Sequence, residues 1–304
     1  HVMASDARHT SYLGVPPGQV DPRHWRQLSR MLAGENGYSG MASWTGTMFE
    51  YFMPHLLLPV EPNSLMYESL SFCLYAQRRR TGGKVPWGIS ESGFYAFDGA
   101  LNYQYKAHGV QALGLRRDLD AELVVAPYAS FLALLLSPGR AGDNLRALRD
   151  LGAEGKYGLY EALDYTPARL AGEKPFEVVR SYMAHHLGMS LLAIDNALNG
   201  NVMQRRFMRD RDMGAFRELL QEKVPVGAAV MKAQGREVPD PPRRLPAAGL
   251  IRSGVWTGEG RPDCHLVSNG AYSVFCTAAG SARERMGDTQ LTTDLGVRFY
   301  VSTP

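Results

Sequence analysis

The feature that most constrains this fold is the spacing of its apolar residues, which recur every three or four positions through residues 1–225. This spacing is typical of amphipathic helices, and Gly and Pro residues separate one segment from the next. Asp21 and Pro22 predict a helix start, and the helix continues over 24–33 until Gly34 ends it. The same pattern predicts further helices over 46–58, 64–80, 120–136, 141–151, 176–198, 203–209 and 213–223. We therefore expect residues 1–225 to be all-α.

The character of the sequence changes after Pro225. Residues 226–250 are rich in proline and basic residues, which is typical of a linker. Within 251–304, apolar and polar residues alternate over 264–277 and 291–302, and this alternation predicts strands. Asn269 and Gly270 form a hairpin-turn pair. The sequence thus predicts a helical region 1–225, a linker 226–250 and a β-rich segment 251–304.

Charge and cysteine content exclude several classes of function. The chain has 33 Lys and Arg against 30 Asp and Glu, and a net charge of +3 does not favour a nucleic-acid partner. The three cysteines form no CxxC pair, so we expect no metal site and no disulfide framework. The sequence has no P-loop and no GxGxxG motif that opens a strand–helix unit, and these are the motifs that would predict a nucleotide cofactor. We therefore expect no cofactor. No apolar run reaches the roughly 18 residues of a membrane span, so we expect a soluble chain.

Two glutamates lie among aromatic and glycine residues, as carboxyl groups at a sugar site would. Glycoside chemistry uses a pair of carboxyl groups across the bond that breaks. Glu91 belongs to WGISES at 87–92, and Glu161 belongs to the aromatic segment 157–166. We interpret both as candidate site residues. The alternative for Glu91 is an exposed loop charge or a helix cap, and the alternative for Glu161 is a surface charge on a short helix. Glu50 could equally be a site residue or a helix cap.

The remaining candidates are residues that could hold a sugar. Adjacent histidines on a helix point about 100° apart, so the pair at 185–186 is not expected to bind one metal ion. We interpret one of the two as binding sugar hydroxyls; the alternative is that one histidine is packed and hydrogen-bonded. Tyrosine offers an apolar ring face together with a hydroxyl group. Tyr105, Tyr128 and Tyr157 are possible cleft residues, although about half of the tyrosines are expected in the core. The predicted substrate-binding residues are Trp44, Glu50, Trp87, Tyr95, Asp98, Tyr103, Tyr160, Asp164, Tyr165, Arg180, His185 and His186.

Together these segments resemble the glucoamylase-like middle region of cyclic β-1,2-glucan synthases. The resemblance covers most of residues 4–225, and its segments occur in the same order: 43–51, 85–92, 101–106, 120–130, 157–167, 179–190 and 201–207. Residues 266–274 resemble the first strands of the glycoside-phosphorylase-like β-sandwich module that follows in those synthases. Leu187 stands where the family usually has glutamine.

The resemblance implies an (α/α)6 toroid whose inner helix ends form a sugar cleft, followed here by a short β-rich segment. About ten helices are predicted before Pro225, so we expect a toroid that is incomplete at its N-terminus, and the start at His1-Val2-Met3 indicates a fragment of a longer protein. The implied activity is retaining transglycosylation, which closes β-1,2-glucan into a ring. Glu91 and Glu161 would be the acid and the nucleophile, with the roles left open.

The resemblance also implies neighbouring modules in the parent protein, namely a membrane-embedded synthase and a phosphorylase-like module. The parent protein would be attached to the inner membrane, with this region on the cytoplasmic side. Three alternatives remain: an inverting endo-β-glucanase on the same fold, a non-catalytic glucan-binding module, and a purely structural spacer, which leaves the aromatic loops unexplained. The β-1,2 linkage enters only through the resemblance, because stacking aromatics and paired acids suit any glucan.

Overall fold

The computed structural model describes residues 1–97, 103–170, 174–232, 264–268, 272–277, 282–286 and 289–290. The chain forms two compact units. One comprises 1–95 and 105–245, and the other comprises 96–104 and 246–304.

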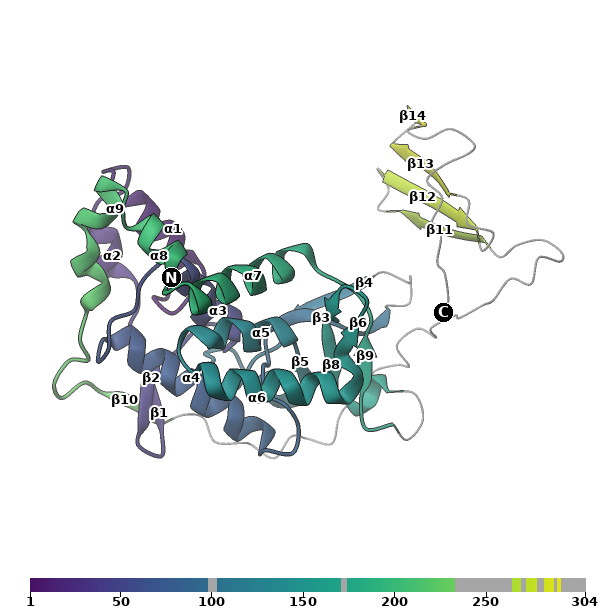
Figure 1. The fold of residues 1–304 in the computed structure, drawn as a ribbon, viewed down its shortest axis with the longest axis horizontal. Coiled ribbons are helices and arrows are strands. Elements are labelled where there is room, and N and C mark those ends of the chain that lie inside the picture. The colour runs from purple at the N-terminus through teal and green to yellow at the C-terminus, as the bar shows by residue number, and fades with distance from the viewer. Residues whose placement is uncertain are drawn as a thin grey trace. The chain divides into compact units, whose positions relative to one another are not determined.

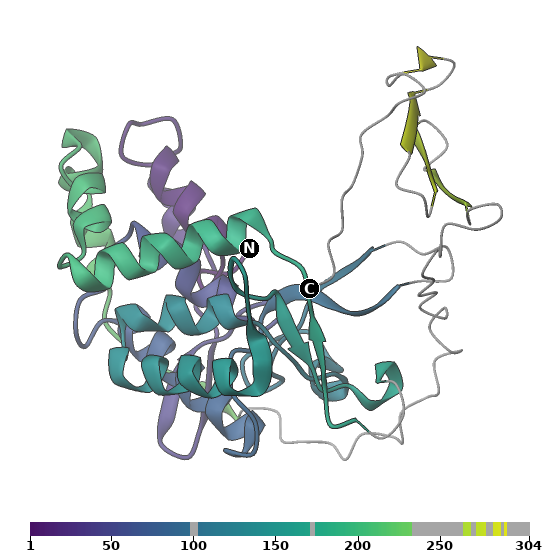
Figure 2. The ribbon, with the colours of Figure 1, turned by 45° about the vertical axis from the view of Figure 1, so that its right-hand side comes forward.

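The helices of the first unit are mostly short. Its α-helices are α1 (Ala7–Gly14), α2 (Arg23–Gln27), α3 (Met48–Phe52), α4 (Leu65–Thr81), α5 (Pro127–Leu132), α6 (Pro138–Leu148), α7 (Ala184–Leu198), α8 (Val202–Phe207) and α9 (Arg211–Ala215). Shorter helical turns are η1 (Met53–Leu56), η2 (Leu119–Ala121), η3 (Ala133–Leu135), η4 (Arg149–Ala153), η5 (Pro167–Arg169) and η6 (Arg217–Gln221). Figures 1 and 2 both show α5, α6 and α7 side by side.

Small sheets connect these helices. β1 (Leu32–Glu35) pairs antiparallel with β2 (Tyr38–Met41) and parallel with β10 (Val230–Lys232). β3 (Glu91–Phe97) and β4 (Tyr103–Ala107) form a two-stranded sheet. An antiparallel sheet has the order β5 (Val124–Val125), β8 (Ala162–Asp164) and β9 (Glu177–Val179). The last pair is β6 (Glu154–Gly155) with β7 (Gly158–Leu159).

Helix α4 contributes many buried residues to the core, and its ends follow from local signals. The Ser64 hydroxyl accepts a hydrogen bond from the Tyr67 amide, and Gly82 ends the helix in the left-handed region with φ 60°. Phe72 is fully buried on its inner face. Strand β2 packs tightly here, because a Cβ at Gly40 would lie 2.5 Å from the Cα of Ser69.

The described residues of 246–304 form one antiparallel sheet. Strands β11 (Cys264–Ser268), β12 (Tyr272–Thr277), β13 (Ala282–Met286) and β14 (Thr289–Gln290) lie in sequence order. Strands β11 and β12 lie within the predicted 264–277. The predicted strand at 291–302 lies outside the described residues.

The expectation of a mainly α (α/α)6 toroid is wrong. Such a toroid needs twelve long helices, whereas the described ranges contain nine α-helices, several of only five or six residues, among short sheets. The chain is mixed α/β. None of the helices in the described part of the chain is both long and apolar enough to cross a membrane.

Several segments whose apolar spacing is helical are divided into shorter elements in the structure, in two cases at a proline. The predicted helix 120–136 is observed as η2, β5, α5 and η3, with Pro127 opening α5. The predicted 46–58 contains only α3, followed by the turn η1 at Pro54. The segment 176–198, predicted as one helix, begins as β9 and becomes helical only at Ala184. The predicted 24–33 ends its helix at Gln27 and enters β1 at Leu32.

Candidate active site

The segment around Glu91 is held by buried amide side chains from two helices. Gln77 of α4 donates from Nε2 to the carbonyl of Ile89 and accepts from its amide, both at 2.8 Å. Asn144 of α6 does the same for Trp87, at 2.7 and 3.1 Å. Gly88 supplies the left-handed turn between them, with φ +126°. The start of β3, and with it Glu91, is therefore fixed to two helices.

Tyr128 of α5 fixes the same strand from a third helix. Its hydroxyl donates to the carbonyl of Glu91 at 3.0 Å and lies 2.7 Å from Oγ of Ser90. Burial raises the pKa of Tyr128 well above its usual value, so the phenol keeps its proton and remains a donor. Its ring stacks on the ring of His186, with centroids 3.8 Å apart.

Glu161, directly before β8, is buried and hydrogen-bonded at both carboxylate oxygens. Its Oε1 accepts from the amide of Gly93 in β3 at 2.9 Å. Its Oε2 lies 2.9 Å from Nδ1 of His186, which is in the first turn of α7. A proton on Nδ1 makes His186 the donor of this bond. Only 4% of Glu161 is exposed.

Tyr105 of β4 connects the two predicted carboxyl groups. Its hydroxyl lies 3.1 Å from Nε2 of His186 and 3.2 Å from Nε2 of His185. The same hydroxyl is hydrogen-bonded to the Glu91 carboxyl. A continuous polar path therefore runs from Glu161 through His186 and Tyr105 to Glu91.

The two carboxyl groups lie in different surroundings. Glu91 is half-buried, and this burial raises its pKa, with a further contribution from the Asp6 carboxylate. The charge of His186 and the hydrogen bond from Tyr105 act in the opposite direction but do not cancel the rise. A carboxyl group with a raised pKa is suited to donate a proton near neutral pH.

A pocket of about 240 Å³ lies beside Glu161 and His186. Tyr160 and Tyr182 form an aromatic wall, with ring centroids 5.2 Å apart. Gly155 lies behind them, and a Cβ there would come within 2.4 Å of both tyrosines. Leu187 also lines the pocket. The pocket therefore combines a carboxylate, an imidazole and stacking rings.

Two other predicted acids are held by local hydrogen bonds. Glu50 forms a capping box with Thr47 at the start of α3 and also accepts from the hydroxyl of Ser43 at 2.8 Å. Asp164 is fully buried and pairs with Arg169 at 2.6 Å. It also accepts from the amide of Tyr95 at 3.0 Å.

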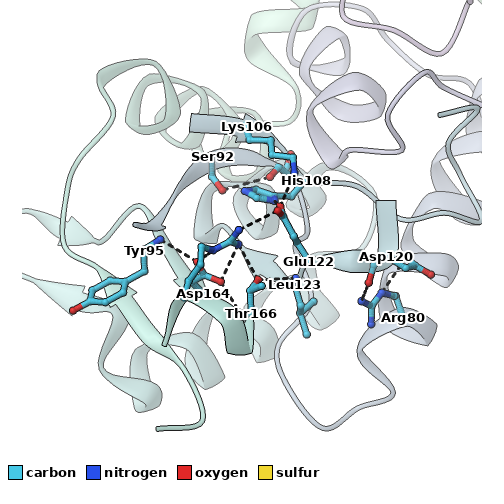
Figure 3. A network of polar contacts seen from close by, with 12 residues as sticks. Arg80, Ser92, Tyr95, Lys106, His108, Asp120, Glu122, Leu123, Asp164 and Thr166 are labelled. Carbon is cyan, nitrogen blue, oxygen red and sulfur yellow. Dashed lines mark hydrogen bonds and ion pairs between the residues drawn. The ribbon is translucent and has the colours of Figure 1, made fainter. Parts of the chain in front are cut away.

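Asp164, in β8, belongs to a network of polar contacts that also includes Tyr95 of β3 and Glu122 (Figure 3). Arg169 also contacts Glu122 at 3.1 Å, and Glu122 contacts Lys106 at 2.9 Å and His108 at 3.2 Å. Burial opposes ionisation of Glu122, but hydrogen bonds from His108 and Lys106 and the charge of Arg169 outweigh it and lower its pKa. This network fixes the sheet that carries Glu161.

The remaining predicted residues are spread over the unit. Trp87 is in the core, with 8% exposed, whereas 60% of Trp44 is exposed. Tyr165 is packed against Phe176, and Arg180 is exposed. Tyr103 is in β4, and Asp98 lies outside the described residues.

Of the predicted residues, the structure therefore brings together Glu91, Glu161, His185, His186 and Tyr160. Gly93 and Tyr182 also belong to this group, and residue type alone does not single them out. No cluster of His, Cys, Asp and Glu side chains in the described ranges could hold a metal ion.

Comparison with known proteins gives two matches. The Glycoamylase family model, described as "Putative glucoamylase", matches residues 3–211. The chain is also 38% identical over 300 residues to the cyclic beta-(1,2)-glucan synthase NdvB of Rhizobium meliloti (strain 1021). That alignment covers 96% of this chain but 10% of the synthase, so the chain is homologous to one region of a much longer protein. The matched residues 3–211 include Glu91, Glu161, His186 and Tyr105, and the chain belongs to the Glycoamylase family.

Proposed function

We propose that this region catalyses retaining glycosyl transfer on β-1,2-glucan, with Glu91 as acid and base and Glu161 as nucleophile. The observation that carries this proposal is the polar path from Glu161 through His186 and Tyr105 to Glu91, beside a pocket with an aromatic wall. The β-1,2 linkage rests on the homology with the glucan synthase, because this pocket chemistry suits any glucan.

In the first step, protonated Glu91 donates its proton to the glycosidic oxygen as the bond to C1 breaks. Glu161 forms a bond to C1, which gives a glycosyl-enzyme ester and releases the leaving chain as an alcohol. The raised pKa of Glu91 supports its role as the proton donor. The hydrogen bonds from Gly93 and His186 to Glu161 support a carboxylate held in one orientation.

In the second step, Glu91 takes a proton from an incoming hydroxyl group as that oxygen attacks C1 and the ester to Glu161 breaks. If the hydroxyl belongs to another glucan, the chain length is redistributed; if it belongs to the same glucan, a ring closes. Both products retain the anomeric configuration, because two displacements occur at C1.

The aromatic wall would bind sugar rings by stacking. Tyr160 and Tyr182 line the pocket next to Glu161, and Tyr157 adds a ring that is 68% exposed. A tyrosine ring offers an apolar face to the C–H face of a sugar and a hydroxyl group to its rim. This wall supports a neutral carbohydrate ligand.

Product analysis with linear β-1,2-glucan tests the proposal, with linear β-1,3- and β-1,4-glucans as controls. Chromatography should reveal new chain lengths or rings from the β-1,2-glucan alone, and NMR of the first product should show retention. An inverted first product would indicate the inverting endo-β-glucanase instead.

A glucan-binding module without catalysis is the second candidate. The observation that favours it is the low exposure of Glu161, whose two oxygens both have protein donors. This alternative predicts unchanged glucan binding by a Glu91→Gln and Glu161→Gln double variant, together with no turnover by the unmodified chain. The transfer proposal predicts turnover that the double variant lacks.

A further inference from the structure

Arg8 is a buried cation without a partner among the described residues. It lies in the first turn of α1, only 4% of it is exposed, and neither Nε nor one terminal nitrogen has a hydrogen-bond acceptor. Burial lowers the pKa of Arg8 to about 10, and no carboxylate contributes to this pKa. At neutral pH the guanidinium is therefore charged, and a buried charge is costly unless it is paired.

The N-terminus of α4 borders the same cavity as Arg8. Leu65 and Met66, the first two residues of this 17-residue helix, line it together with Arg8. The Leu65 amide donates to the carbonyl of Glu222, and the Tyr67 amide donates to the Ser64 hydroxyl. The helix itself provides no acceptor for the amide of Met66, and its dipole favours a negative charge at this end.

The cavity has room for one small species. Its volume is about 20 Å³, enough for a water-sized occupant and too small for a sugar or a phosphate. Apart from Arg8 and the α4 turn, its walls are mostly apolar. The acid in its lining, Glu222, is paired with Arg30 at 2.5 Å. Burial lowers the pKa of the nearby His55 to about 4, so His55 is neutral at neutral pH and Arg8 carries the positive charge.

We propose that this cavity binds a small monovalent anion of halide size, held between the Arg8 guanidinium and the first turn of α4. The anion neutralises Arg8 and fixes α1 on the core. Tyr12, one turn after Arg8, already ties α1 to α9 by donating to the carbonyl of Met213 at 2.7 Å. The site is independent of the proposed glucan chemistry.

Urea unfolding in sodium chloride and in sodium gluconate at equal ionic strength tests this proposal. An anion that binds only the folded chain stabilises it by mass action, so the urea midpoint should rise with chloride concentration. The rise should be absent in Arg8→Met and intact in Arg23→Met, whose arginine is exposed. The proposal is overturned if the urea midpoint does not change with chloride concentration, or if it rises by the same amount in Arg8→Met.

Two further measurements cover the case in which Arg8→Met does not fold. Crystals of the unmodified chain grown in sodium bromide should give an anomalous peak beside Arg8; water alone there contradicts the proposal. If Glu222 were the counter-ion of Arg8, chloride would have no effect on the unmodified chain and would act only on Glu222→Gln. The proposal instead predicts a chloride effect in both.

Discussion

His186 is the residue on which the geometry of the candidate site depends. Its ring stacks on Tyr128, its Nδ1 contacts Glu161, and its Nε2 contacts Tyr105. One imidazole thus links three elements, since Tyr128 is in α5, Tyr105 in β4 and Glu161 next to β8. Its neighbour His185 is exposed, and desolvation and the charge of His186 lower the pKa of His185.

The burial of His55 predicts that the free energy of unfolding falls as the pH is lowered. Burial lowers its pKa from 6.5 to about 4, so the unfolded chain takes up a proton that the folded chain does not. This stability is present above about pH 6.5 and is lost as the pH falls towards 4; at about 1.4 kcal/mol per pH unit it amounts to roughly 3 kcal/mol. Urea unfolding between pH 7 and pH 4 should show a smaller loss in His55→Gln than in a His24→Gln control. Equal losses would contradict this account.

Substitution of Gly155 provides a steric test of the aromatic wall. A Cβ at this position would lie 2.4 Å from the Tyr160 ring and the Tyr182 hydroxyl, so Gly155→Ala should displace both rings. Displacement of groups that position the substrate should lower glucan turnover by about 10- to 100-fold. The control is Gly188→Ala on α7, where a Cβ meets nothing within 4 Å. Steady-state kinetics that show the same turnover in both variants would argue against a role of the wall.

At the scale of elements, the site is a strand anchored by helices. The segment 87–91 is bonded to α4 through Gln77, to α6 through Asn144 and to α5 through Tyr128. Because all three side chains are buried, each bond is protected from water, and an unmade bond here leaves a buried polar group unpaired. The position of Glu91 is therefore coupled to the stability of the core.

Gln77→Met tests this coupling. The variant keeps the side-chain volume but leaves the Ile89 amide without its partner, whereas the Ile89 carbonyl still accepts from the Met48 amide at 3.3 Å. The unpaired amide should cost about 1–3 kcal/mol of unfolding free energy. Gln221→Met, at an exposed position, should change that free energy by less than about 0.5 kcal/mol. Urea unfolding of both variants measures the difference, and a loss below about 1 kcal/mol in Gln77→Met would refute the anchoring.

Arg169→Met tests the ionic network. Removing this arginine takes the ion-pair partner from the fully buried Asp164 and one of three basic contacts from the half-buried Glu122. We therefore expect a loss of about 3–5 kcal/mol of unfolding free energy. The exposed Arg117 provides the matched control, Arg117→Met, which should stay within about 0.5 kcal/mol of the unmodified chain. Guanidinium chloride screens ion pairs, so urea is the denaturant of choice. Similar unfolding of the two variants would mean that the network contributes little.

Local signals predicted some elements and not others. Helix α4 was predicted at 64–80 and is observed at Leu65–Thr81, because Ser64 and Gly82 are strong end signals within the segment itself. The prediction of one helix over 120–136 was wrong, because Val124 and Val125 pair with β8, some 40 residues further on. Apolar spacing carries no information about such a partner.

The same limit of local patterns explains why the sequence predicted only part of the site. Glu91, Glu161 and His186 stand out by composition, since each lies among aromatic or glycine residues. The stacking of Tyr128 on His186 joins residues far apart in the sequence, and no local pattern encodes it. Trp87 illustrates the opposite case: a tryptophan beside an acid is equally compatible with stacking on a sugar and with burial, and here it is buried.

At the scale of the whole molecule, the chain is homologous to one region of a longer protein. It corresponds to a tenth of the glucan synthase with which it is homologous. The residues of the candidate site all belong to the unit formed by 1–95 and 105–245. Under the proposed function, this unit acts on glucan directly rather than only connecting other modules.

The most direct test of this account is the rate of chain-length redistribution on linear β-1,2-glucan by Glu91→Gln, measured beside Glu218→Gln. Glu218 is exposed on η6, so its variant should match the unmodified chain. Loss of the proton donor should lower the rate in Glu91→Gln by about 10²- to 10⁴-fold. Equal rates in the two variants would contradict the assignment of Glu91 and, with it, the proposed glycosyl transfer.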